Sequence, residues 1–233
     1  MTQVKALVES IDKFIKGCKE DSSPNEGVSN WDAIKACCIM SGWNGLNGAL
    51  VPLKGDAPTN FNFVSADYDR VTGLKGDGST KYLDSNRSNS ADPKNNNHNF
   101  VYMTEGPDSE CALMGAGGPG DIANNIGVSG NGNFFVRNRS SDSSSSNFIK
   151  GFVATSRFSA EGYDFRRGEE TIDFTYESGS PISDNVFIFG RSVASLLPTD
   201  ARMSIYGIGE AIDLAALDAR VTTLMTEIEA ALT

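Results

Sequence analysis

Residues 72–84 read TGLKGDGSTKYLD, and this stretch decides the fold class. Asp77 and Gly78 stand at its centre as a dipeptide that favours a tight turn between antiparallel strands. Apolar residues flank the turn at Leu74 and Leu83, with Tyr82 beside the second. We therefore predict a β-hairpin whose alternating residues enter the core of a sandwich.

The same pattern of short strands and turns extends in both directions from this hairpin, over residues 46–210. Gly, Asn, Pro and Ser are dense there, and apolar residues recur at a period close to two. No helical pattern separates the strands, which disfavours a parallel α/β sheet. We predict a mainly β chain, an antiparallel β-sandwich of the jelly-roll type. Its predicted strands are residues 60–64, 73–74 with 80–83, 99–104, 112–115, 122–129, 133–138, 149–156, 162–166, 171–176, 186–191 and 202–208.

Helical periodicity replaces this pattern at both ends of the chain. Residues 1–45 are predicted to be a helical segment, with helices near residues 4–18 and 30–41. Residues 211–233 are predicted to form one amphipathic helix, with Asp213 near its start, where the helix dipole favours an anion. We expect this helix to pack on the domain or on a partner through one apolar stripe, formed by Leu214, Leu217, Val221, Leu224 and Ile228.

The chain is acidic, with a formal net charge of −10. Such a charge repels phosphate backbones, and no cluster of Lys and Arg interrupts it, so we expect no nucleic-acid partner. No apolar stretch approaches the ~18 residues of a membrane span, so we expect neither membrane insertion nor a cleaved secretion signal. The four cysteines lack metal-ligand spacing, and we predict buried, reduced thiols.

We expect no enzymatic activity and no cofactor. His98 is the only histidine, and it stands outside any nucleophile motif, which argues against a triad that uses histidine. Glu169 and Glu170 are neighbours, so in a strand they would point to opposite faces and could not act as the carboxylate pair of a glycosidase.

Acidic turns offer weak candidates for a calcium site. Asp67, Asp69 and Asp77 supply the oxygen ligands that calcium prefers, but their spacing does not match an EF-hand loop. Acidic turns are also ordinary in a chain of this charge, and that alternative stays open.

Aromatic residues and polar loops offer candidates for a ligand site. Trp43, Tyr68 and Tyr82 could form a platform for a sugar, with core packing as the alternative. Residues 85–98 and 140–147 are predicted to be polar surface loops, where sandwiches place recognition, although the serine run also fits a solvated spacer. The candidate ligand-binding residues in the loops are Asn95, Asn96, Asn97, His98, Asn131 and Asn133.

Two parts of the sequence resemble laminin-G-like, concanavalin-A-like domains. Residues 72–84 are similar to the opening strand pair of that fold, and residues 202–214 to its last strand and short terminal helix. Most of residues 10–230 also resembles a family of bacteriophage virion proteins, particularly from phages of marine bacteria. That resemblance is carried by residues 31–36, 48–53 with 57–61, 82–87 with 91–93, and 208–220.

The resemblance implies a laminin-G-like sandwich carried on a phage particle, as a capsid decoration, a tail component or a fibre tip. The protein would then be assembled in the host cytoplasm, in several copies or as a homo-oligomer, beside other virion proteins. The alternative is a lectin that recognises a host-surface glycan, and a glycan-active enzyme is the remote one. The family supplies no catalytic residue and fixes no calcium or sugar site.

Overall fold

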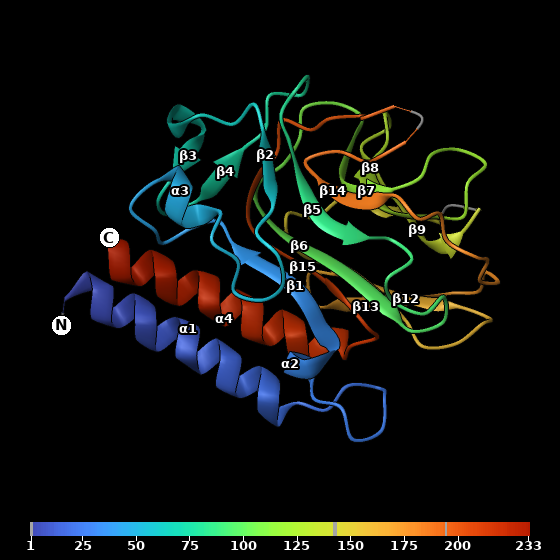
Figure 1. The fold of residues 1–233 in the computed structure, drawn as a ribbon, viewed down its shortest axis with the longest axis horizontal. Coiled ribbons are helices and arrows are strands. Elements are labelled where there is room, and N and C mark those ends of the chain that lie inside the picture. The colour runs from blue at the N-terminus through green and yellow to red at the C-terminus, as the bar shows by residue number, and fades with distance from the viewer. Residues whose placement is uncertain (1, 142–143, 194) are drawn as a thin grey trace.

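The computed structural model describes residues 2–141, 144–193 and 195–233, which form three layers (Figure 1). Two antiparallel sheets lie face to face, and two long helices cover the far side of one of them. The prediction of an antiparallel β-sandwich with helices at both ends is confirmed. We call the sheet beneath the helices the inner sheet and the other the outer sheet.

Within the described ranges the outer sheet has seven strands and the inner sheet eight. In spatial order, the outer sheet consists of β10 (Ser144–Asn147), β9 (Asn133–Ser140), β8 (Ala123–Val128), β7 (Cys111–Ala116), β14 (Asn185–Ile188), β5 (Tyr82–Ser88) and β2 (Thr59–Phe61). The inner sheet consists of β13 (Glu170–Phe174), β12 (Tyr163–Arg167), β11 (Gly151–Arg157), β6 (Asn97–Glu105), β15 (Arg202–Gly209), β4 (Gly73–Lys75) and β3 (Tyr68–Asp69), with β1 (Ile34–Ile39) also paired to β15.

The core between the sheets follows from side-chain alternation along the strands. In β9, Phe134 and Val136 are fully buried, while Phe135 between them and Arg137 after them are only half-buried and belong to the other face. Val186 and Ile188 of β14 enter the same core, and Phe187 points outward. Among the described residues no helix covers the outward side of the outer sheet, which we call the open face, although some of its positions, such as Asn125, are themselves buried.

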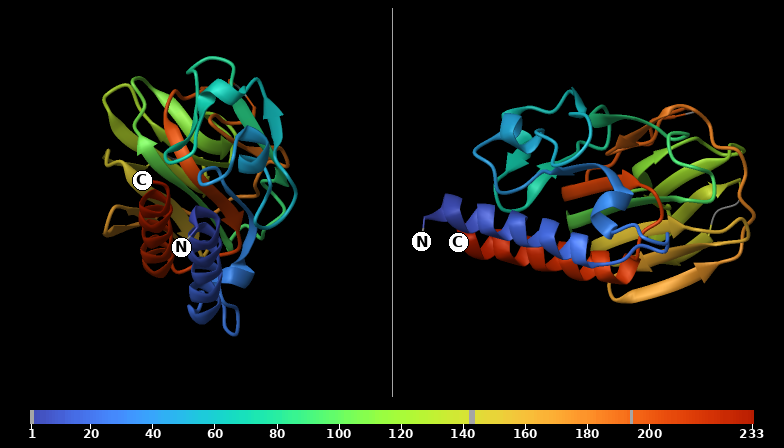
Figure 2. Two further views of the ribbon diagram at one scale, coloured as in Figure 1. Left: turned by 90° about the vertical axis from the view of Figure 1, so that its left-hand side faces the viewer. Right: turned by 60° about the horizontal axis from the view of Figure 1, so that its bottom comes forward.

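The two long helices, α1 (Gln3–Glu20) and α4 (Leu214–Leu232), lie side by side along the inner sheet (Figure 2). Leu7 and Phe14 of α1 are buried in a second apolar cluster with residues of α4 and the inner sheet. Asp213 caps α4, because its carboxylate accepts the N–H groups of Ala215 and Ala216 at 2.9 and 3.0 Å. The predicted helix and its acidic start are confirmed, and we call the pair the helical hairpin.

The predicted second helix, residues 30–41, is wrong over most of its length. Only Asn30–Ala33 is helical (α2), and Ile34–Ile39 forms strand β1 against β15. The run Ala33 to Met40 is apolar on every side and is buried on both faces of the inner sheet, with Lys35 the exception. Periodicity alone cannot separate such a run from a buried helix, and pairing with β15 decides the outcome.

The predicted hairpin at residues 72–84 is also wrong, since its two strands belong to different sheets. Strand β4 pairs with β15 and β3 in the inner sheet, and β5 pairs with β14 and β2 in the outer sheet. The Asp77 carboxylate accepts the N–H groups of Ser79, Thr80 and Lys81, which holds the chain as it crosses between the sheets. The local turn chemistry is as predicted, but the strand pairing is not.

Two predicted loops are partly strands. Residues 82–88 form β5, and β6 begins at Asn97, so only residues 89–96 of the first loop remain a connection. Residues 144–147 of the serine run form edge strand β10 on β9, while residues 142–143 lie outside the described ranges. Short helices α3 (Leu46–Ala49) and η1 (Ser65–Asp67) complete the fold.

The cysteine prediction is confirmed: Cys18, Cys37, Cys38 and Cys111 are free and buried. Burial raises the pKa of the Cys38 thiol to about 12, because desolvation disfavours the thiolate. Among the helices of the described ranges, none combines the length and apolarity that crossing a lipid bilayer requires.

Candidate functional site

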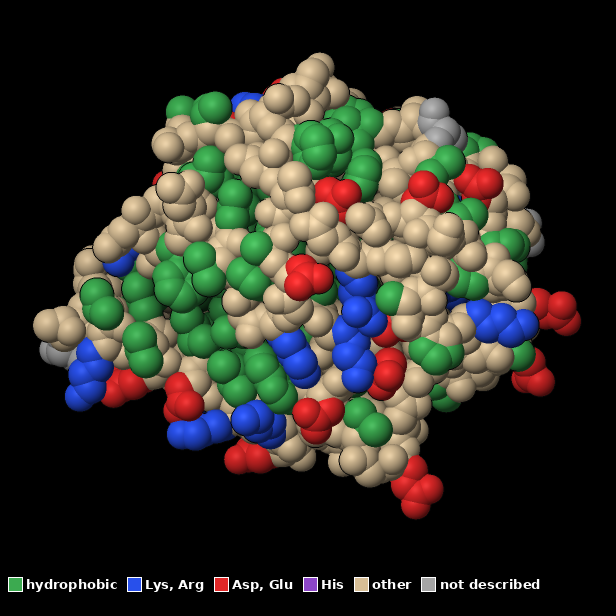
Figure 3. Space-filling model, viewed as in Figure 1, with side chains coloured by type: hydrophobic (Ala, Val, Ile, Leu, Met, Phe, Trp, Pro, Cys, Tyr) green, Lys and Arg blue, Asp and Glu red, His purple; other side chains and the backbone are tan. Residues whose placement is uncertain are grey.

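A row of three aromatic rings crosses one end of the open face. The rings of Phe61 and Tyr82 are stacked with centroids 4.4 Å apart and planes 6° apart, and Tyr82 stacks on Phe187 at 4.7 Å and 24°. Each ring stands on a different strand, β2, β5 and β14. We call this row the aromatic ladder, and Figure 3 shows hydrophobic side chains at the surface over β2 and β5.

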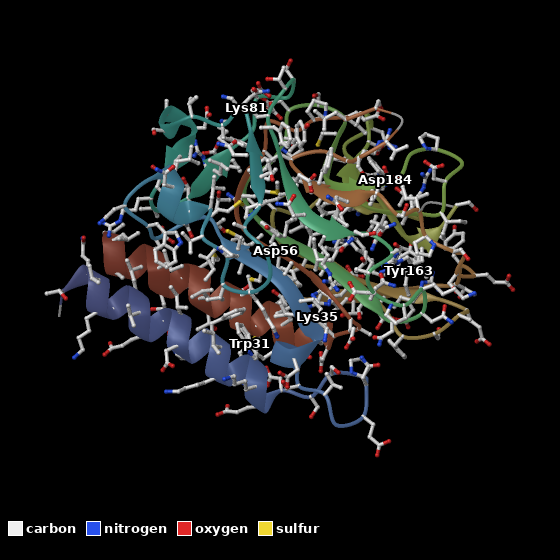
Figure 4. The ribbon with its side chains drawn as sticks, viewed as in Figure 1. Trp31, Lys35, Asp56, Lys81, Tyr163 and Asp184 are labelled. Carbon is white, nitrogen blue, oxygen red and sulfur yellow. The ribbon has the colours of Figure 1, made fainter. Side chains whose placement is uncertain are left out.

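Strand register explains the ladder. Phe61 lies directly opposite Tyr82, and Phe187 lies opposite Asp84, which follows Tyr82 on the same face. The distances between ring centroids are therefore close to the ~4.8 Å spacing of neighbouring strands. Phe61 is 37% exposed, although a ring of this size is usually buried in a monomeric protein. Lys81 and Asp184 mark where the chain enters β5 and β14 (Figure 4).

Polar groups border the ladder on its own strands. The Asp84 carboxylate accepts hydrogen bonds from the Asn185 amide at 3.2 Å and from the backbone N–H of Asn86 at 2.8 Å. The Asn86 amide in turn donates to Thr59 at 3.0 Å. Apolar rings beside oriented carboxylate and amide groups suit an amphipathic ligand.

The row continues from Phe187 across three more strands without another ring. Gly115 lies opposite Phe187, Asn125 opposite Gly115, and Arg137 opposite Asn125. A Cβ at Gly115 would stand 1.9 Å from the Asn125 amide oxygen, so only glycine lets that amide lie across the strand. The amide and the Arg137 guanidinium donate to the carbonyl oxygens of Gly117 and Gly118, each at 2.9 Å.

A shallow hollow of about 330 Å³ adjoins the ladder. Its lining includes the rings of Tyr82 and Phe187, the side chain of Val193, which is 44% exposed, and Arg191. Arg191 is held by Ser195, since its Nε donates to the Ser195 carbonyl and its Nη2 to the Ser195 hydroxyl, both at 3.2 Å. The hollow thus combines apolar walls with one oriented guanidinium.

Neither arginine of this face forms an ion pair with a carboxylate of the described residues. Burial lowers the pKa of Arg191, and the charge of Arg137 lowers it further, while Glu110 and Asp121 act in the opposite direction. Arg87, Arg166, Arg167, Arg202 and Arg220 each meet a carboxylate within 4 Å. Arg70, Arg139 and Arg157 likewise have no carboxylate within 4 Å among the described residues, so what sets Arg191 apart is its place in the lining of the hollow.

The predicted ligand residues 95–98 each make a hydrogen bond within the protein itself. His98 is fully buried, stacks on Phe100 and donates from Nδ1 to the carbonyl oxygen of Glu210, so its prediction as a ligand residue is wrong. Asn97 is 1% exposed and bonds Asn124. Asn95 accepts a hydrogen bond from Ser178, and Asn96 accepts from the backbone N–H of Ala211 at 2.7 Å.

The other two predicted ligand residues lie at the opposite end of β8. Asn131 is exposed in the β8–β9 turn, where its side chain accepts the Ser129 hydroxyl and the N–H of Asn133. Strand β8 has six residues, so this turn is roughly 17 Å from Asn97, which contacts the start of that strand. The structure does not bring the two groups of asparagines into one site.

The carboxylates of the three calcium candidates are already bonded to nearby groups of the protein. Asp67 pairs with Lys81 at 2.6 Å, and Asp69 accepts the N–H groups of Val71 and Thr72. For Asp77, burial opposes the charged form, but hydrogen bonds from Lys81, Thr80 and Ser79 lower its pKa to about 2. In the part of the chain that the structure describes, no three His, Cys, Asp or Glu side chains are grouped as metal ligands.

The predicted partner stripe of the C-terminal helix faces the chain's own core. Its five residues are between 0% and 4% exposed and pack on α1 and the inner sheet, so they offer no surface to a partner. The residues in question are Leu214, Leu217, Val221, Leu224 and Ile228. Of the two packing alternatives, docking on the domain is the one observed.

The proposed aromatic platform does not form as predicted. Tyr68 lies on β3 of the inner sheet, where its hydroxyl donates to the Trp43 carbonyl at 2.8 Å, and the Trp43 indole N–H donates to Ile39. Only Tyr82 belongs to the open face. Phe61 and Phe187 were not predicted, because the sequence shows their alternation but not the pairing of β2, β5 and β14. Arg191 was not predicted either, since its place beside Phe187 depends on the loop that follows β14.

Comparisons with known proteins agree with the fold. No family model matches the chain, and no curated protein matches it. Among solved structures, the botulinum neurotoxin serotype D binding domain has a TM-score of 0.54 at 10% identity, covering 82% of this chain and 51% of that one. A Trypanosoma rangeli sialidase in complex with sialic acid has a TM-score of 0.51 at 14% identity, covering 96% of this chain and 38% of that one.

The chain thus spans about two fifths to one half of these two proteins. At such identities the likeness shows the β-sandwich fold, which is consistent with the concanavalin-A-like sandwich that the sequence resemblance implied.

Proposed function

We propose that the protein is a carbohydrate-binding module that uses the open face of its outer sheet. The observation that carries this proposal is the aromatic ladder, three stacked rings at the surface of a sheet that no helix covers. Sugars are amphipathic, and their C–H faces pack on aromatic rings while their hydroxyls require polar partners. Asp84 and Asn185 supply such partners beside Phe187.

The named structural neighbours support the same class of function. One is the binding domain of a toxin, and the other is a sialidase in complex with a sugar acid. Their fold resembles that of this chain, and the ladder gives a local reason to expect a similar class of ligand here.

We propose binding without catalysis. The single histidine is buried, and its pKa is lowered to about 4, chiefly by desolvation, so it is neutral and out of reach of a substrate. Asp164 and Asp173 lie directly opposite each other on β12 and β13 and share a hydrogen bond. A pair in direct contact lacks the roughly 5–10 Å separation that glycosidase carboxylates need.

The phage setting implied by the sequence resemblance is a second candidate, and it stays a prediction. One observation favours attachment to a larger assembly: Val4 and Val8 of α1 are each 61% exposed on the outside of the helical hairpin. In that setting the module would be a virion protein that meets other virion proteins through the hairpin and a host glycan through the ladder.

A glycan array tests the proposed function. We expect the intact protein to bind a subset of glycans, and Tyr82→Ala to reduce their affinity about tenfold or more, because it removes the central ring. Phe158→Ala is the matched control, since Phe158 is 55% exposed and lies outside the ladder. An array without binding at high protein concentration, with and without calcium, would exclude the proposal.

A further inference from the structure

The hollow beside the ladder combines apolar side chains with one guanidinium. Tyr82, Phe187, Val193 and Leu196 supply apolar walls, and Arg191 is the one charged side chain of its lining. Burying a cation without an ionic partner is costly unless hydrogen bonds compensate. Arg139 and Arg157 are also buried without an ion pair among the described residues, but unlike Arg191 they do not line this hollow.

The Arg191 guanidinium is oriented rather than mobile. Its Nε and Nη2 both donate to Ser195, and the side chain is 8% exposed, so the plane of the group is fixed by its own loop. Nη1 donates no hydrogen bond among the described residues, which leaves donor capacity on the group.

Charges of both signs surround the hollow: Arg137 lies near Arg191, while Glu110, Asp121 and the Asp84 carboxylate opposite Phe187 are the anions. Arg137 stands on the same face and acts electrostatically on Arg191, and neither forms an ion pair within 4 Å among the described residues. Glu110 and Asp121 offset part of this charge, and Asp121 is engaged as acceptor of the Gly118 N–H at 2.8 Å. An anionic group that enters the hollow would gain a charge-assisted hydrogen bond from Arg191.

We infer that this site selects sugars that bear a carboxylate, with Arg191 as the residue that recognises the acid and the ladder as the surface that packs on the ring. The inference rests on the proposed function, since it names the ligand class of the same face. Arginine suits this role because its planar fork matches a carboxylate, whereas lysine offers only a point charge. Arg137 contributes through its charge and is not placed in contact with the ligand.

A matched pair of ligands tests the inference on the intact protein without any mutation. The probes are 3′-sialyllactose and the same trisaccharide with its carboxyl group reduced to an alcohol, with a glucuronate-ended and a glucose-ended disaccharide as a second pair. We expect the acid of at least one pair to bind about tenfold or more tightly than its neutral counterpart in calorimetry, with a preference that weakens as salt rises.

Variants then assign the preference to a residue. Arg191→Gln is expected to abolish the difference in affinity between acid and neutral sugar, and Arg191→Lys to restore part of it. Arg70→Gln is the control, because Arg70 is also without a carboxylate partner but bonds Gln3 and Gly42 near the hairpin. A thermal melt of each variant shows whether loss of the Ser195 contacts has unfolded the loop or the domain.

The outcomes separate the two proposals. Glycans that bind through Tyr82 with equal affinity for acid and neutral forms would overturn the charge preference and leave the carbohydrate function standing. An acid preference that survives Arg191→Gln would overturn the role of Arg191. Absence of binding to every glycan, acid or neutral, would overturn both.

Discussion

At the scale of single residues, a buried histidine and a half-buried aspartate have opposite effects on stability. His98 sits between Phe100 and Gly209 with its Nδ1–H on the Glu210 carbonyl, and desolvation lowers its pKa to about 4. Burial, and then the adjacent charge of Asp173, raise the pKa of Asp164 to about 6. Both groups change charge within the mildly acidic range.

The first prediction concerns His98. Its folded pKa is below the unfolded value of about 6.5, so the unfolded chain binds the proton first and stability falls as pH drops from about 6.5 to about 4. A shift of this size is worth on the order of 3 kcal/mol. We expect His98→Asn, which keeps a donor near Nδ1, to flatten this dependence in urea unfolding measured at several pH values.

Asp164→Asn is the counterpart to that variant. The folded pKa of Asp164 is above its unfolded value, so its contribution to stability is present below about pH 4 and is lost as pH rises to about 6. Removing it should therefore make the acid-side loss of stability steeper, the reverse of the His98 variant. If both variants change the slope in the same direction, the assigned pKa directions are wrong.

At the scale of elements, the helical hairpin is part of the core rather than an appendage. Leu217 of α4 is fully buried against α1 and the inner sheet, while Val8 of α1 is 61% exposed. The hairpin ends are also joined by Arg220 and Asp21, which form two hydrogen bonds of 2.9 Å. The same two helices thus have one face that stabilises the fold and one that is available to solvent.

The second prediction follows from that difference in burial. Leu217→Ala should lower the free energy of unfolding by about 2–5 kcal/mol, because it leaves a cavity beneath α4. Val8→Ala should change it by less than about 0.5 kcal/mol, since an exposed side chain loses little on truncation. Equal effects of the two substitutions in guanidinium unfolding would mean that the hairpin does not pack as described.

The predictable elements are those whose signals are local. The stripe of α4 and its Asp213 cap could be predicted because both follow from neighbours along the chain. Strand β1 could not, since Ile34–Ile39 is apolar except at Lys35 and only β15, far away in sequence, makes it a strand. Asp77 and Gly78 predicted a turn correctly but not that it connects two sheets.

The candidate site was less predictable for the same reason. Phe61, Tyr82 and Phe187 each occupy an outward position of a short strand, yet no spacing in the sequence shows that they stack. The three asparagines before His98 suggested a polar loop in which the imidazole could contact a ligand. In the structure His98 lies on β6 of the inner sheet and is fully buried. Polar loops were favoured as the recognition surface, whereas the structure assembles its candidate surface on strands.

At the scale of the whole molecule, the inner sheet couples two cores. Its one face packs on the outer sheet, and its other face packs on the hairpin. Tyr206 and Ile205 are neighbours on β15, and they enter the first and second cluster respectively. Neither cluster can be disrupted without exposing one face of the same strands.

The third prediction is therefore a single cooperative unfolding transition. Trp31 lies at the corner of α2 and β1 beside the hairpin (Figure 4), and Trp43 packs near Tyr68 on the sandwich side. We expect tryptophan fluorescence, which reports both sites, and far-ultraviolet circular dichroism to give coincident midpoints in denaturant. A separate early transition in the helical signal would show that the hairpin unfolds independently. Reducing agent should leave the midpoint unchanged, because the four cysteines are free.

The three-layer order has one further consequence, which concerns valency. The hairpin and the open face lie on opposite outer layers, with both sheets between them. A copy held through its hairpin would point its ladder away from the support, so neighbouring copies on one surface would present their rings in the same direction. Weak single contacts with a glycan-coated surface would then add up, and avidity rather than the affinity of one module would set the strength of adhesion.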